Sequence, residues 1–193
     1  NDTVVVAEGA KITTLNTANG DDTVVNFGTV STLNTGNGAD AIFNAETGTV
    51  KGNINTGAGA DIVQNDGTVK SNILGGAGND QIVNNGKGNV NGQSGTDVII
   101  NGNKVVFENT KNNIPLGEND NAVINADGTV TVTTTDEVNN KQTITTFDKN
   151  GNKVSTEEKE IKDTKAEEEA RLAAEAEAKA KAEEEARLAA EAE

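Results

Sequence analysis

Thr35-Gly36-Asn37-Gly38-Ala39-Asp40 is the stretch on which the rest of the sequence can be aligned. Related stretches end at Asp22, Asp61, Asp80 and Asp97, so five copies follow one another at spacings of 18, 21, 19 and 17 residues. A glycine always stands two residues before the aspartate, a β-branched residue two after it and an asparagine four after it. The residue seven before it is always aliphatic: Leu15, Leu33, Ile54, Ile73 or Val90. A repeat of this length predicts a solenoid in which each copy is one coil.

The composition favours a repeat with a thin core over a compact globule. Of the 193 residues 33% are hydrophobic, the only aromatic residues are four Phe, and the net charge is −15. A solenoid buries only a narrow stripe of Val, Ile and Leu in each coil. The negative charge argues against nucleic acid and anionic membranes as partners, and no apolar stretch is long enough for membrane insertion. The chain has no Cys, which excludes disulfides and Cys metal sites.

Residues 1–110 are predicted to form a right-handed parallel β-solenoid of about five coils, with an N-terminal cap strand. Between successive aspartates, strands of three to five residues alternate with Gly/Asn turns, and no segment shows helical periodicity. Ala45-Glu46 predicts a two-residue bulge in the second coil. The Gly-x-Asp turn itself keeps its length in every copy.

Residues 111–154 are predicted to form a small antiparallel β cap. Strands are expected at 122–124, 129–135, 142–147 and 153–156, joined by Asp-Gly, Asn-Asn and Asn-Gly turns. Such a meander would cover the open end of the solenoid and prevent edge-to-edge pairing. Gly117-Glu118-Asn119-Asp120 is interpreted as a degenerate sixth repeat turn.

Residues 155–193 are predicted to form a long charged α-helix. Lys165–Glu177 recurs unchanged as Lys181–Glu193, and the segment consists largely of strong helix formers. Ser155 or Thr156 would be the N-cap. Large apolar residues are too widely spaced for a coiled coil, so the helix is interpreted as a solvated stalk.

The repeat aspartates predict a calcium site. Stacking in register would place Asp22, Asp40, Asp61, Asp80 and Asp97 in one column, about 4.8 Å apart. Like charges at that distance repel, and a calcium ion between adjacent turns would compensate by binding Asp oxygens and backbone carbonyls. Glycines before the aspartate, among them Gly38, Gly59, Gly76 and Gly78, would let those carbonyls turn inward.

Gly75-Gly76-Ala77-Gly78-Asn79-Asp80-Gln81-Ile82-Val83 fits every position of the RTX (repeats-in-toxin) nonapeptide, so residues 15–106 resemble RTX repeats. RTX proteins fold as parallel β-rolls with calcium turns on both sides, whereas this chain has one such turn per coil. It therefore looks more like the one-sided calcium solenoids of RTX adhesins, or the Asn/Gly repeats of autotransporter passengers and surface-layer proteins. Thr replaces the first glycine in three copies and Ala18 or Gln93 the second in two, which leaves metal binding in the first and last turns open.

Other interpretations of the repeat positions need no ligand. The aspartates would then be exposed and would cap their own turns through local hydrogen bonds. The asparagine column is predicted to form an amide ladder along the stack. Thr17, Thr35 and Thr56 are interpreted as turn-flanking residues, with an outward, ice-binding array as the alternative.

The predicted function is a structural, non-enzymatic segment of an extracellular bacterial surface protein of the adhesin, surface-layer or autotransporter-passenger type. The chain lacks His, Cys and Tyr and hence the usual nucleophile–base pairs. The second hypothesis is a module that binds glycan, ice or mineral through a flat solenoid face. The third is a polysaccharide-active enzyme with paired carboxylates, for which Glu8 and Asp22 are the candidates. Self-association through the solenoid ends is a further expected interaction.

Overall fold

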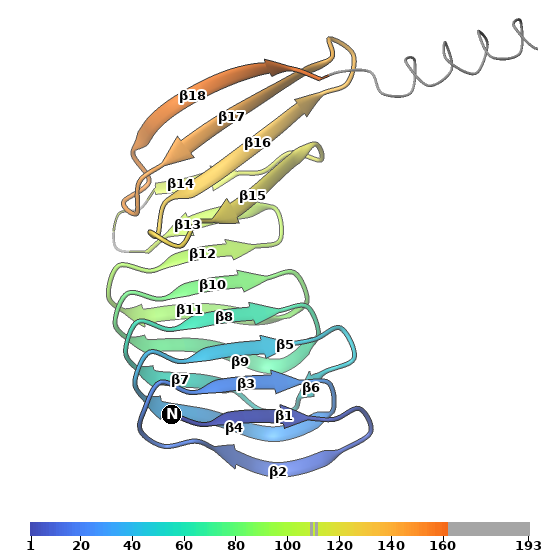
Figure 1. Cartoon of the computed structure of the whole chain (residues 1–193), viewed down its shortest axis with the longest axis vertical. Coiled ribbons are helices and arrows are strands. Elements are labelled where there is room, and N and C mark those ends of the chain that lie inside the picture. Colours follow the sequence, from blue (N-terminus) through green and yellow to red (C-terminus); the bar gives the residue numbers. More distant parts are fainter. Residues whose placement is uncertain (109, 111, 162–193) are drawn as a thin grey trace, which may run out of the picture.

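The computed structural model describes residues 1–108, 110 and 112–161, and every regular element in this part of the chain is a β-strand. The predicted stack of parallel coils is confirmed, with about five turns (Figure 1). No helix long and apolar enough to cross a membrane occurs among these residues.

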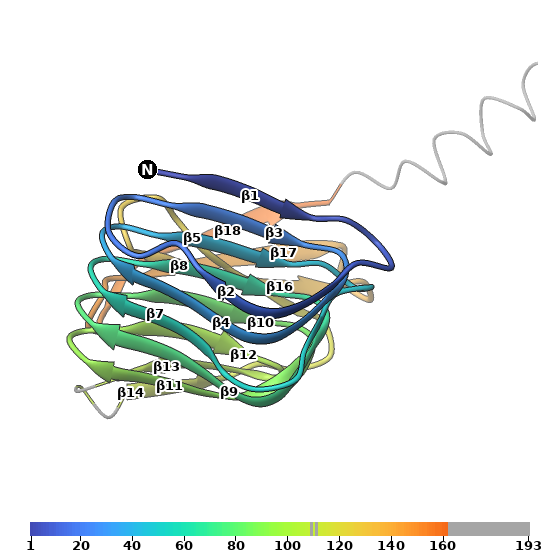
Figure 2. The same cartoon turned by 90° about the horizontal axis from the view of Figure 1, so that it is seen from below.

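Each coil contributes to two sheets, which Figures 1 and 2 show from two directions. The parallel strands of the first sheet are β1 (Thr3–Val6), β3 (Thr23–Asn26), β5 (Ala41–Asn44), β8 (Ile62–Asn65), β10 (Gln81–Asn84) and β12 (Val98–Asn101). Those of the second are β2 (Lys11–Asn16), β4 (Thr29–Asn37), β6 (Thr49–Val50), β7 (Ile54–Ala58), β9 (Thr68–Ala77) and β11 (Lys87–Ser94). β6 and β7 together occupy one rung of the second sheet, because both pair with β4 and with β9.

The main core lies between the two sheets and is made of the repeat positions that the alignment singled out. In the first sheet Val24, Ile42, Val63, Ile82 and Ile99 follow one another in register. In the second sheet Leu15, Leu33, Ile54, Ile73 and Val90 do the same. The middle members of both columns are fully buried. Identical inward positions in every coil therefore build one continuous apolar stripe.

Beyond β12 the chain turns back on itself and the parallel order ends. β13 (Lys104–Phe107) pairs antiparallel with β12, and β14 (Asn112–Pro115) pairs antiparallel with β13. Val106 of β13 packs against the main core, so the hairpin of β13 and β14 continues the first sheet beyond the last parallel coil. That the meander covers the open end stays a prediction.

The meander consists of β15 (Asp120–Ile124), β16 (Val130–Asp136), β17 (Lys141–Phe147) and β18 (Lys153–Glu160). Val130 and Val132 form a second core with Phe107 of β13 and with Val98 and Ile100 of β12. Val98 and Ile100 alternate with the inward-facing Ile99, so they lie on the outer face of the first sheet. The meander thus covers the outside of the last coils.

The prediction of a helix from Ser155 is wrong for residues 155–160. These residues belong to β18, which pairs with β17 along its length. Pairing with an existing sheet edge supplies main-chain hydrogen bonds and outweighs the local helix propensity of Glu and Lys. The rest of the predicted stalk, residues 162–193, lies outside the described residues.

Candidate metal centre: the aspartate column

The five repeat aspartates superpose along the stack, one in each coil, immediately before a strand of the first sheet. Each is 1% exposed or less. Oδ1 of each aspartate from the second to the fifth accepts the backbone N–H of the aspartate in the coil before, at 2.8 to 2.9 Å. The pairs are Asp22 with Asp40, Asp40 with Asp61, Asp61 with Asp80, and Asp80 with Asp97. The interpretation as exposed residues with local turn bonds is therefore wrong.

The second oxygen of each of these carboxylates has no partner. Oδ2 of all five aspartates is buried and accepts no hydrogen bond among the described residues. A buried carboxylate oxygen without a donor is costly, because burial removes its water and nothing replaces it. Five such atoms in one column are the feature that most requires an explanation.

The pKa values of the aspartates are shifted in different directions along the column. Burial raises the pKa of Asp61 and of Asp97, and burial together with the charges of its two neighbours raises that of Asp80 to about 6. The backbone hydrogen bond from Asp2 instead lowers the pKa of Asp22. Charging the carboxylate in the folded protein is therefore less favourable at Asp61, Asp80 and Asp97 than at Asp22.

The residue five positions before each aspartate differs between the first three coils and the last two. In the first three coils this residue is Thr17, Thr35 or Thr56, each buried with its hydroxyl donating to a carbonyl of the next coil. In the last two coils it is glycine, and a Cβ at Gly75 or Gly92 would overlap the Oδ2 atom of Asp80 or Asp97. In the last two turns the aspartate carboxylate thus lies against the glycine, where a threonine side chain stands in the first three. The burial of the threonines also excludes them as an outward, ice-binding array.

Glu108 adds a second carboxylate at the C-terminal end of the column. Its Oε2 accepts the backbone N–H of Gly92 at 2.9 Å, and its own N–H donates to the carbonyl of Asp97 at 3.0 Å. A Cβ at Gly92 would overlap both Glu108 Oε2 and Asp97 Oδ2, so the two carboxylates border the same small space. Burial and the charge of Asp97 raise the pKa of Glu108.

Two members of this site were not predicted. Glu108 has no counterpart in the repeat and follows the last coil, so no sequence signal marked it. Asp2 stands one position before β1 as Asp22 stands one position before β3, and its N–H donates to Asp22 Oδ1. The Asp2-x-Val4 spacing was a usable signal, because it repeats the aspartate and the β-branched residue of the later coils. In the predicted sixth repeat turn, the aspartate contacts its own turn: Gly117 N–H donates to Asp120 Oδ2.

The glycines of the turns are explained by close stacking of the coils. Gly38, Gly59 and Gly78 have φ values of 136°, 149° and 143°. A Cβ on Gly59 or Gly78 would overlap the carbonyl oxygen of the matching glycine in the coil before, and the same holds for Gly76 against Gly57. Only glycine satisfies both requirements. Their role as calcium ligands through backbone carbonyls stays a prediction.

The donor set fits a calcium ion only in part. Among the described residues no three or more Asp, Glu, His or Cys side chains converge on one point that could hold a metal. Calcium takes six to eight oxygens, many of them backbone carbonyls or water, so two carboxylates are sufficient as the charged ligands. Asp97 and Glu108, whose carboxylates lie against the same glycine, supply two, and Asp97 Oδ2 is unpaired among the described residues.

The asparagine column forms the predicted amide ladder. Nδ2 of each asparagine donates to Oδ1 of the asparagine in the next coil at 2.6 to 2.9 Å, through Asn26, Asn44, Asn65, Asn84 and Asn101. Because the amides donate to and accept from one another, this column satisfies itself without a ligand.

The chain matches no protein-family model and no curated protein, and no solved structure matches it. The assignment as a stacked parallel β-solenoid therefore rests on the coil geometry, and RTX or autotransporter type remains a resemblance in sequence.

Proposed function

We propose that this chain is a structural, non-enzymatic segment of an extracellular bacterial surface protein, rigidified by calcium at its Asp/Gly turns. The observation that carries the proposal is the column of five buried carboxylates with unpaired Oδ2 atoms. A divalent cation would compensate these charges and remove the penalty that burial places on them. Right-handed winding of the coils, the usual hand of β-crossovers, is part of the proposal.

The structural support for calcium binding differs along the aspartate column and is strongest in the last two turns. There the carboxylates of Asp80 and Asp97 lie against Gly75 and Gly92, and Glu108 places a second carboxylate against Gly92, next to Asp97. In the first three turns a threonine side chain occupies the equivalent position. We therefore assign the calcium ligands to Asp97, Glu108 and Asp80 before Asp22, Asp40 and Asp61. Extracellular calcium is abundant, so a weak site would be filled outside the cell.

Thermal unfolding of the full chain at pH 7.5 tests this function. We expect millimolar CaCl2 to raise Tm relative to EGTA by about 3–10 °C, because a ligand at ten to a hundred times its Kd contributes roughly 1.4–2.7 kcal/mol. Asp97→Asn and Glu108→Gln should each abolish most of this shift, and MgCl2 should not replace calcium. Glu118→Gln, at an exposed carboxylate outside the column, is the matched control. Equal Tm values in calcium and EGTA would rule out the calcium assignment.

A surface-binding module for glycan or mineral is the second candidate, and the exposed outer face of the first sheet favours it. Val5 of β1 and Ile62 of β8 are 61% and 52% exposed there. Binding of the full chain to a glycan array or to mineral particles would support this role, and absence of binding to both would exclude it.

Self-association through the solenoid end is the third part of the proposal. Among the described residues β1 and β2 are the last strands of their sheets on one side, and a second copy of the chain would pair with their outer main-chain groups. Light scattering at increasing concentration should show growth of particle mass, and a constant monomer mass would contradict it.

A further inference from the structure

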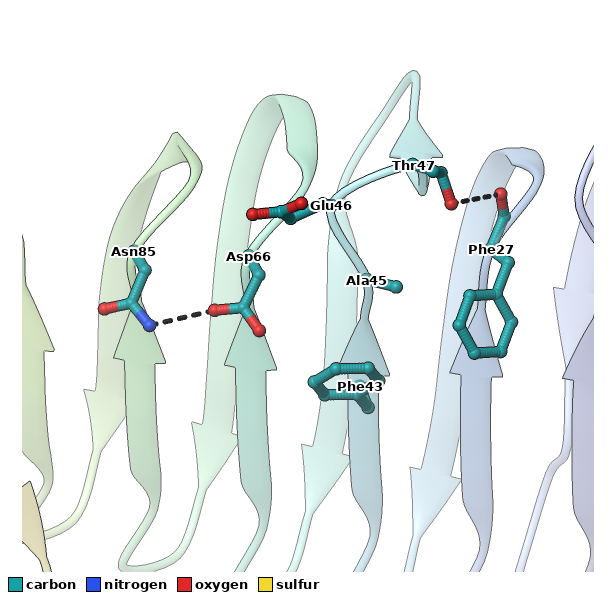
Figure 3. A pocket seen from close by; sticks show the side chains of 7 residues that line it. All are labelled: Phe27, Phe43, Ala45, Glu46, Thr47, Asp66 and Asn85. Carbon is teal, nitrogen blue, oxygen red and sulfur yellow. Dashed lines mark hydrogen bonds between the residues drawn. The ribbon is translucent and has the colours of Figure 1, made fainter. Parts of the chain in front are cut away.

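A hollow of about 600 Å³ lies on the outside of the solenoid, at the turns that follow the strands of the first sheet. Figure 3 shows the side chains that line it, which come from four successive coils. They are Phe27, Phe43, Ala45, Glu46, Thr47, Asp66 and Asn85. None of them belongs to the aspartate column, so the hollow is a separate feature.

The hollow exists because one turn is longer than its neighbours. A single residue, Phe27, Asp66 or Asn85, separates the ladder asparagine from the next glycine in three coils, whereas Ala45-Glu46-Thr47 fills this place in the coil of β5. The Thr47 hydroxyl donates to the carbonyl of Phe27 at 3.0 Å and attaches the longer turn to the coil before (Figure 3). The predicted two-residue bulge is thereby confirmed and forms part of the wall.

Two aromatic rings line the hollow and belong to neither hydrophobic core. Phe27 is 38% exposed and Phe43 is half-buried on the outer face of β5. The other two Phe residues of the chain, Phe107 and Phe147, pack in the second core. Half of the aromatic residues of this chain therefore line one surface hollow. Their presence there is not explained by packing in a hydrophobic core.

The polar atoms of the hollow are mainly hydrogen-bond acceptors. Asp66 is held in place by amide donors, with Asn85 Nδ2 at 2.8 Å from Oδ1 and Gln64 Nε2 at 3.0 Å from Oδ2. Within the described part of the chain neither Asp66 nor Glu46 takes part in an ion pair, and no Lys or Arg lines the hollow. The Thr47 hydroxyl proton and one Asn85 proton are already engaged. A ligand for this site must supply donors and positive charge.

We propose that the hollow binds an arginine side chain presented by a partner polypeptide. A guanidinium group has five donors and no acceptor, and its planar face stacks on aromatic rings. Here Phe27 and Phe43 provide the rings, and Glu46 and Asp66 provide the carboxylates. A sugar ring would also stack on Phe, but its hydroxyl groups need donors as well as acceptors from the protein. This site is independent of the proposed calcium turns.

Titration of the full chain with the peptide acetyl-Gly-Arg-Gly-amide, followed by amide chemical shifts in ¹⁵N-labelled protein, tests the proposal. EGTA is present throughout, so the result does not depend on calcium. We expect shifts confined to residues 27–28, 43–47, 64–67 and 85–86. The neutral citrulline peptide should bind at least about tenfold more weakly, because it lacks the charge that both carboxylates attract.

Substitutions in the hollow distinguish direct contact with the arginine peptide from general electrostatic attraction to the acidic chain. Asp66→Asn, Glu46→Gln and Phe27→Leu should each weaken the arginine peptide by about threefold to tenfold. Glu8→Gln is the matched control, because Glu8 is an exposed carboxylate in the equivalent turn one coil before Phe27 and does not line the hollow. It should leave affinity unchanged.

Three results would overturn the proposal. They are no shift at these residues with the arginine peptide, equal binding of the citrulline peptide, and equal loss of affinity in Glu8→Gln. Shifts of the same amides by a neutral oligosaccharide such as maltohexaose, without shifts by the arginine peptide, would also overturn it and would identify the hollow as a glycan site.

Discussion

Each repeat aspartate has two differently used carboxylate oxygens. Oδ1 accepts a backbone N–H from the neighbouring coil and thereby fixes coil spacing, whereas Oδ2 accepts no hydrogen bond from any described residue. An asparagine at the same place would keep the Oδ1 contact without the charge. The repeat has aspartate at this position in all five copies, although it has asparagine in the ladder four residues later. This difference favours a role for the charge itself.

The metal-free protein should lose stability as the pH rises from 4.5 to 7. Asp61, Asp80, Asp97 and Glu108 have raised pKa values in the folded state, so folding favours their protonated forms. Their contribution is full below the unfolded pKa of about 4 and is lost as the pH passes the folded pKa, about 6 for Asp80. Urea unfolding in EGTA at several pH values measures this.

The variant Asp80→Asn isolates the column from the general repulsion of a chain with net charge −15. It should reduce the loss of unfolding free energy between pH 4.5 and 7 by on the order of 1–3 kcal/mol. A pH dependence identical to that of the unaltered chain would show that Asp80 does not titrate as its buried position requires.

At the level of elements, the turns set how closely the coils stack. Gly57 has a φ of 102°, and a Cβ there would overlap the carbonyl oxygen of Gly36 in the coil before. Gly102 has a φ of 58°, but no atom of the described residues lies within 4 Å of its Cβ position. Backbone strain is common to both positions, whereas the overlap with a neighbouring coil is specific to Gly57.

Gly57→Ala should therefore destabilise the protein much more than Gly102→Ala. We expect about 1 kcal/mol for Gly102→Ala from strain alone and several kcal/mol for Gly57→Ala, because the adjacent coils must separate to relieve the overlap. Chemical denaturation of both variants gives the comparison. Similar losses would mean that the coils are less tightly stacked at this turn.

At the scale of the whole molecule, two cores share the last coils. The main core lies between the two sheets and the second lies between the outer face of β12 and the meander. Phe107 of β13 is fully buried in the second core, which also contains residues of β12 in the solenoid and of β16 in the meander. It therefore couples the unfolding of the two parts.

Phe107→Ala should lower the unfolding free energy by about 3–5 kcal/mol, because a large buried side chain is lost and leaves a cavity. The meander should then unfold before the solenoid, and calorimetry should show two transitions in place of one. Phe27→Leu, at a partly exposed ring outside both cores, is the control and should change stability by less than about 0.5 kcal/mol. A single unshifted transition would contradict the coupling.

The sequence alone determined the coil repeat, its inward columns and the asparagine ladder. Val63, Asn65 and Asp61 recur at fixed offsets, and stacking in register follows because each coil meets a near copy of itself. The sequence also located the longer turn at Ala45. These features are local or periodic, so they can be read from spacing.

Tertiary structure decided the features that the sequence repeat does not determine. β18 is a strand because β17 offers an edge to pair with, although Ser155 begins a helix-forming composition. Glu108 joins the column only because β13 returns antiparallel to β12. The burial of Thr35 and the unpaired oxygens of the aspartates depend on how closely the coils approach one another. Contacts between segments that do not repeat are fixed by packing in three dimensions, and no spacing in the chain records them.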